Sequence, residues 1–292
     1  MITWVDLLLE PFSYTFMVRG MVAAVMVGIV CAVVGTYIVL RGMAFFGDAL
    51  AHAILPGVAV GYLVGGGARE PLFWWSLVTA IAASIGIGAV SKGAQLREDT
   101  AIGIVFAGMF ALGIALISTV RDYTADLTHF LFGDVLGVSN LDLELIALFG
   151  LVILLTVFLF YKEFLVLSFD PLLAATLRVP THILEYVLLV LIALTVVVSL
   201  KTVGVALMVA MLVTPAATAY LLTRRMPYMM ALGAVFASLA GVIGLYLSYY
   251  ISVSSGAAIV LTSTVIFAIA WGLRAMQKAY RQKSPLPFTP TS

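Results

Sequence analysis

The sequence contains little charge and almost no cysteine. Of its 292 residues only 15 are basic and 14 acidic, which makes 10% charged, whereas 63% are hydrophobic. A soluble domain carries roughly 25% charged residues, so water would not solvate a surface this poor in charge. Cys31 is the only cysteine, which excludes an intrachain disulfide and a cysteine-cluster metal site. The composition therefore excludes a cytosolic enzyme, a secreted disulfide scaffold and a disordered chain.

Several chemical motifs are also absent. No Gly-Lys dipeptide occurs, so the chain has no P-loop with which to bind ATP, and no HExxH metalloprotease pattern is present. The histidines number three: His52, His129 and His182. The net charge of +1 gives no support for binding of nucleic acid. The first ten residues hold two acids and no base, so we expect an interfacial lead-in and not a cleavable signal.

What the sequence has in abundance is long apolar runs, and the mean hydropathy is +1.18. A hydrocarbon core of about 30 Å needs about 20 apolar residues per helix. The sequence predicts an all-α, polytopic transmembrane bundle with eight to ten spans. Nine runs fit: Phe16–Leu40, Ala49–Val64, Leu72–Val90, Thr100–Val120, Leu143–Tyr161, Ile183–Leu200, Val203–Leu222, Tyr228–Ile251 and Ala257–Leu273.

The basic residues predict the orientation of the bundle. Lys and Arg favour cytoplasmic loops. With the C-terminus inside, the outer side holds only Arg19, Arg69, Arg121 and Lys201, and the other eleven basic residues lie inside. We therefore expect the N-terminus outside and the C-terminus inside. Residues 1–275 form the membrane domain in this interpretation, and residues 276–292 form a disordered cytoplasmic tail.

One acidic residue, Asp48, fits neither the inner loops nor the outer side of the predicted bundle well. Asp48 and His52 are four residues apart, so on a helix they share one face. A carboxylate and an imidazole at this spacing can bind one divalent metal ion, and ionisable groups inside a span usually face a pathway. Pro56 has no N–H to give to the His52 carbonyl and predicts a break or kink there. Alternatively, Asp48 is a helix cap and His52 bonds to a neighbouring helix.

Other features of the spans indicate packing. Pro215 predicts a kink in the seventh span. Small residues recur every four positions around the Asp48–His52 pair and again late in the chain, which permits close helix contact. These two series are Ala49, Ala53, Gly57, Gly61 and Gly65, and then Gly233, Ala237 and Gly241. Met208 and Met211 are expected to be core residues and not soft metal ligands.

Four stretches in order resemble the manganese/zinc/iron ABC transporter permeases, the ABC-3 family. The stretch Val39–Gly57 resembles the family signature, and Glu98–Ile104 resembles the start of its fourth helix. Leu131–Ser139 resembles its outer segment, and Val203–Ala219 its seventh-helix motif. The resemblance covers roughly residues 10–275.

The resemblance implies the membrane subunit of an importer in the prokaryotic plasma membrane. Such permeases pair with a second copy, bind two cytoplasmic ATPase subunits and receive metal from an extracytoplasmic binding protein. Asp48 and His52 match the family positions for metal translocation. A segment at about 165–180 matches the family's ATPase-coupling helix, with an Asp cap followed by Pro at the first helical position. Its candidate contact residues are Asp170, Pro171, Ala174, Leu177 and Arg178.

Some alternatives remain open from the sequence. The acidic outer segment with Asp122, Asp126, His129 and Asp134 attracts cations or docks the binding protein, but an ordinary solvated loop fits equally well. The transported ion is expected to be manganese, with zinc or iron as the alternatives, and no permanent cofactor is expected. A channel or secondary transporter without an ATPase is the rival class, and an intramembrane enzyme is disfavoured because the spans lack a catalytic cluster.

Overall fold

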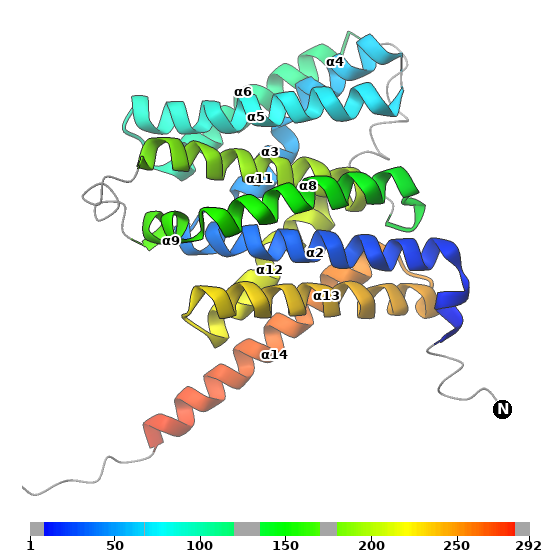
Figure 1. Ribbon diagram of the computed structural model, residues 1–292, viewed down its shortest axis with the longest axis vertical. Coiled ribbons are helices and arrows are strands. Elements are labelled where there is room, and N and C mark those ends of the chain that lie inside the picture. The colour runs from blue at the N-terminus through cyan, green and yellow to red at the C-terminus, as the bar shows by residue number, and fades with distance from the viewer. Residues whose placement is uncertain (1–8, 67, 120–134, 170–179, 284–292) are drawn as a thin grey trace, which may run out of the picture.

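A computed structural model describes residues 9–66, 68–119, 135–169 and 180–283 (Figure 1). Throughout these ranges the regular structure is helical, without a strand. The helices are η1 (Glu10–Ser13), α2 (Thr15–Arg41), α3 (Phe46–Ala53), α4 (Leu55–Gly65), α5 (Arg69–Gly93), α6 (Glu98–Ile117), η2 (Val135–Gly137), α8 (Asn140–Leu159), α9 (Tyr161–Phe169), α11 (Thr181–Val203), α12 (Val205–Leu222), α13 (Met226–Ile251) and α14 (Ser255–Lys283).

Nine segments within the described ranges are long and apolar enough to cross a bilayer. Each overlaps one of the nine predicted runs, which confirms the predicted all-α membrane bundle. The second span consists of two helices, α3 and α4, which meet at Ile54. Pro56 lies in the first turn of α4, where its missing N–H removes no helical bond, so the predicted break is present.

Two boundaries differ from the sequence prediction. The sequence predicts a disordered tail from residue 276, but α14 continues to Lys283 because no proline or glycine interrupts the run before Pro285. Residues 284–292 lie outside the described part of the chain. The connection after the fifth span also contains a helix, α9, whose Phe164 and Leu167 are buried.

Helix α2 runs through the middle of the bundle, with α12 and α13 on one side and α8 and α11 on the other (Figure 1). Glycines bring the backbones close. A Cβ on Gly35 would overlap the Leu212 carbonyl oxygen of α12, and one on Gly28 would stand 3.1 Å from Ala237 Cβ of α13. Gly241 lies similarly against Ala24. The late series of small residues is therefore the packing surface between α13 and α2.

The last three residues of the first series, Gly57, Gly61 and Gly65, pack α4 onto α5. A Cβ on Gly57 would collide with both the Trp75 carbonyl oxygen and Thr79 Oγ1. A Cβ on Gly61 would stand 2.8 Å from Leu72 Cα. Only glycine allows this approach, so these positions hold the second half of the broken span against the next helix.

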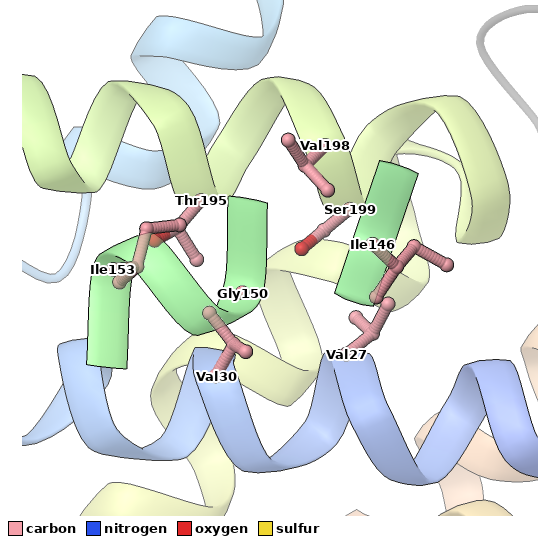
Figure 2. A pocket seen from close by; sticks show the side chains of 8 residues that line it. All are labelled: Val27, Val30, Ile146, Gly150, Ile153, Thr195, Val198 and Ser199. Atoms are coloured by element: carbon pink, nitrogen blue, oxygen red, sulfur yellow. The ribbon is translucent and has the colours of Figure 1, made fainter. Parts of the chain in front are cut away.

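A small cavity of about 10 Å³ lies where α2, α8 and α11 meet (Figure 2). Val27 and Val30 of α2, Gly150 of α8 and Ser199 of α11 line it. Ser199 Oγ lies 3.3 Å from the buried Cys31 Sγ. The cysteine is therefore a packing residue of the core.

Ion pairs lie at both ends of the bundle. Lys92 at the end of α5 pairs with Glu185 near the start of α11. At the opposite end, Lys201 Nζ of α11 lies 3.0 Å from Asp142 Oδ1 at the start of α8. Each ion pair thus joins the last turn of one span to a residue near the start of another. The last turns of α14 point away from the other helices (Figure 1).

Candidate metal site

The polypeptide reverses direction between α2 and α3, just before the predicted metal-binding pair. Gly42 ends α2 in the left-handed conformation, with φ of 71°. The Met43 N–H then donates to the Ile38 carbonyl at 3.0 Å, and the Met43 side chain is buried. This is a Schellman-type helix end, for which glycine is favoured. The Arg-Gly-Met sequence thereby stops α2 and lets α3 begin at Phe46.

Helix α3 carries Asp48 and His52 on one face, as their spacing predicted. His52 Nδ1 lies 3.8 Å from Asp48 Oδ1 and 3.0 Å from the Asp48 carbonyl oxygen. The side chains are 32% (His52) and 37% (Asp48) exposed, so both remain accessible. A Cβ on Gly47 would stand 2.6 Å from Leu212 Cδ2, so the residue before Asp48 packs directly on α12.

The hydrogen bond to Asp48 determines which imidazole nitrogen is available. A carbonyl oxygen has no hydrogen, so Nδ1 must carry the proton that it donates at 3.0 Å. In the neutral ring Nε2 then keeps its lone pair and can bind a metal ion. Backbone carbonyls commonly hold metal-binding histidines in this way. The alternative that His52 bonds to a neighbouring helix is not the arrangement found, because its hydrogen bond lies within α3.

One copy of the chain supplies few metal ligands here. Among the described residues, no group of three or more His, Cys, Asp or Glu side chains could hold an ion. Asp48 and His52 could therefore supply at most one oxygen and one nitrogen side-chain donor from one copy. Divalent metal ions in proteins take about four to eight ligands, so a complete site needs donors from elsewhere.

Helix α6 faces this site. Its first turn contains Glu98, whose Oε1 lies 2.7 Å from Arg41 Nη2 at the end of α2. Arg41 is 10% exposed, so the ion pair is largely buried on the arginine side. Further along α6, the Phe106 and Phe110 rings lie against the His52 ring at centroid distances of 6.1 and 5.9 Å. Sequence reasoning missed both phenylalanines, because their spacing of four places them on one face of the fourth span but does not show which residue they contact.

The other residues that the sequence analysis singled out have different outcomes. The proposed coupling residues Asp170, Pro171, Ala174, Leu177 and Arg178 lie outside the described residues, and so do His129 and Asp134. Pro215 lies inside α12, which runs continuously from Val205 to Leu222, and the kink there stays a prediction. Met208 and Met211 are fully buried, as expected of core residues.

Comparison with known proteins decides the family. Residues 13–274 match the model of the ABC 3 transport family. The chain belongs to this family. The resemblance seen in the four sequence motifs is therefore confirmed over nearly the whole chain.

Individual relatives agree with the family. The chain is 44% identical over 262 residues to the "Manganese transport system membrane protein MntC" of Halalkalibacterium halodurans, covering 90% of this chain and 88% of that one. It is 38% identical over 265 residues to the "Chelated iron transport system membrane protein YfeD" of Yersinia pestis, covering 91% and 88%. Among solved structures, "PsaBC from Streptococcus pneumoniae in complex with Fab" matches with TM-score 0.82 and 37% identity, covering 97% of this ABC 3 chain and 100% of that one.

Within the ABC 3 family fold, three of the four motifs converge on α3. The first motif supplies α3 itself together with Arg41. The second supplies Glu98, the partner of Arg41. The fourth supplies Leu212, which packs on Gly47 beside Asp48. The motifs are far apart in the sequence, and in the fold all three lie around the Asp48–His52 pair.

Proposed function

We propose that this chain is the membrane-spanning subunit of an ATP-driven importer of divalent transition-metal ions, with manganese as the cargo. The observation that carries the proposal is the accessible Asp48–His52 pair on a short helix inside the second span. One carboxylate oxygen and one imidazole nitrogen suit manganese, iron and zinc. The manganese-transport relative at 44% identity favours manganese, and the chelated-iron relative at 38% identity keeps iron as the alternative.

A second copy of the chain completes the pathway in this proposal. Asp48 and His52 provide two donors and are about a third exposed. Two copies meeting at this face would bring four donors together without any new residue type. The ion then crosses between the copies, passing from an extracytoplasmic binding protein toward the cytoplasm.

ATP hydrolysis takes place on two separate cytoplasmic subunits, because the sequence contains no P-loop. Asp170, Pro171, Ala174, Leu177 and Arg178 contact these subunits. They follow α9 directly, and α9 is anchored by Phe164, whose ring lies 5.6 Å from that of Tyr37 on α2. A displacement of this segment would therefore be transmitted through the Phe164–Tyr37 contact to α2, which ends at Arg41. The N-terminus lies outside and the C-terminus inside.

The test is manganese uptake by the complete transporter in liposomes with its binding protein outside. Asp48→Asn and His52→Gln remove one donor each at nearly constant volume, and we expect both to abolish uptake. Asp99→Asn, in the first turn of α6, and His182→Gln, which keeps an acceptor for Lys92, are matched controls that should transport normally. Size-exclusion chromatography checks that every complex assembles.

Normal uptake in either Asp48→Asn or His52→Gln would refute the proposed pathway. Uptake that persists without ATP and the ATPase subunits would favour a channel or secondary transporter. Direct measurement of manganese, zinc and iron uptake identifies the cargo, because zinc can displace manganese by binding more tightly without being transported.

A further inference from the structure

Two phenylalanine rings lie against the imidazole that the proposed function assigns to the metal ion. The Phe106 ring meets the His52 ring at 88° and the Phe110 ring meets it at 70°, both in edge-to-face arrangements. Such contacts at centroid distances of about 4.5–7 Å are favourable and orientation-dependent. The two phenylalanines are one helical turn apart on α6, so they present a single surface to His52.

Further contacts hold the Phe106 and Phe110 rings in place. The Phe106 and Phe110 rings stack on each other with centroids 5.7 Å apart. Phe45, in the turn before α3, closes the cluster against Phe106 at 6.2 Å. The Arg41–Glu98 ion pair fixes the first turn of the same helix to the end of α2. Helix α6 is thus held to the end of α2 by the ion pair and to the start of α3 by the Phe45 contact.

An imidazole without such contacts has two available orientations. The terminal torsion of histidine is broad and roughly two-fold, so the ring can turn over and exchange the places of Nδ1 and Nε2. The single hydrogen bond from Nδ1 to the Asp48 carbonyl selects one orientation. Because about a third of the His52 side chain is exposed, water competes for that bond. The two rings restrict the turning that would break it.

We propose that Phe106 and Phe110 are positioning residues that hold the His52 ring so that Nε2, and not Nδ1, binds the transported ion. This inference rests on the proposed function and adds to it the identity of the ligand atom and the residues that select it. Neither phenylalanine touches the ion. Their effect is exerted through His52, as for other groups that orient metal-binding histidines.

The first experiment assigns the nitrogen in the unaltered protein. The complete transporter is prepared with histidine labelled with ¹⁵N at either Nδ1 or Nε2, and bound Mn²⁺ is studied by pulsed electron paramagnetic resonance. We expect the directly bonded manganese–nitrogen coupling to come from the Nε2-labelled sample. A coupling from Nδ1 would overturn the inference, and this result does not depend on any variant folding.

The second experiment tests the rings. Phe106→Leu and Phe110→Leu should weaken Mn²⁺ binding by about 10- to 100-fold, the range seen when groups that orient a ligand are lost. They should also mix the two nitrogen couplings. Phe110→Tyr keeps the ring and should retain wild-type binding and the Nε2 coupling. Phe158→Leu is the matched control, because Phe158 on α8 is 82% exposed and its replacement should change nothing.

The outcomes separate the two proposals. If the wild-type protein binds Mn²⁺ through Nε2 and both leucine variants do so with unchanged affinity, the positioning role is wrong and the metal pathway stands. If Asp48→Asn and His52→Gln bind and transport manganese normally, the pathway itself is wrong and the positioning role falls with it.

Discussion

Arg41 Nη2 lies 2.7 Å from Glu98 Oε1, and this ion pair joins the end of α2 to the start of α6. The two residues are 57 positions apart in the sequence. Arg41 precedes the turn into α3, and α6 carries the rings around His52. The pair therefore joins the two elements between which the proposed metal-binding residues, Asp48 and His52, lie.

Removing one member of this pair should destabilise the protein more than removing both. Glu98→Gln leaves a guanidinium that is 10% exposed without its counterion. We expect a loss of about 2 kcal/mol, below the value for a fully buried pair because Glu98 is partly exposed. Arg41→Met combined with Glu98→Leu should recover most of it. Thermal unfolding of the purified complex measures both effects, and equal stability of single and double variants would contradict the prediction.

Gly35→Ala should prevent normal packing of α2 on α12. The new Cβ would overlap the Leu212 carbonyl oxygen, and a backbone atom cannot move aside alone. We expect a destabilisation of about 3 kcal/mol or more, with a fall in the yield of folded protein. Gly103→Ala in α6 is the control, because no atom outside its own helix turn lies within 4 Å of the position that its Cβ would take. The prediction fails if both variants are recovered at wild-type level.

Lys201→Met should loosen the opposite end of the bundle. Lys201 Nζ lies 3.0 Å from Asp142 Oδ1 and 5.0 Å from the centre of the Phe73 ring, which joins α11, α8 and α5. Asp142 also forms a capping box with Ser139. We expect a loss of about 1–3 kcal/mol, because a carboxylate that is 16% exposed loses its cation. Lys278→Met, at an exposed position of α14, should leave the melting temperature unchanged.

Pro56→Ala should reduce metal transport while leaving the stability of the protein nearly unchanged. Alanine restores an N–H that can bond to the His52 carbonyl, which favours joining α3 and α4 into one helix. Because Pro56 lies in the first turn of α4, we expect stability to change by less than about 1 kcal/mol. Metal uptake should fall, since joining α3 to α4 would reorient the Asp48 and His52 side chains. Pro71→Ala, in the first turn of α5, is the control, and uptake equal in the two variants would argue against the break having a role in transport.

The sequence predicted the spans well because each is a long apolar run with clear ends. It also predicted the break at Pro56, since proline lacks the N–H that a continuous helix would donate to the His52 carbonyl. The Asp48–His52 proximity followed from their spacing of four within one helix. These features are local, so periodicity and composition are enough to find them.

The remaining features depend on contacts between distant segments. Nothing local indicates that Glu98 pairs with Arg41, or that the Phe106 and Phe110 rings lie on His52. The helix α9 escapes prediction because its nine residues are too few for a span and mix Lys162 and Glu163 with apolar side chains. The predicted end of α14 falls too early because basic residues favour the end of a span, although they also suit a helix that emerges into water.

The brevity of α3 has an electrostatic consequence. A helix carries partial positive charge at its first N–H groups and partial negative charge at its last carbonyls. In α3 the carboxylate of Asp48 lies in the first turn, at the end that favours an anion, and the imidazole of His52 lies in the last turn, at the end that favours a bound cation. Because α3 ends within the second candidate span, its negative pole lies beside His52. The backbone therefore adds to the attraction of a cation toward His52, independently of any side chain.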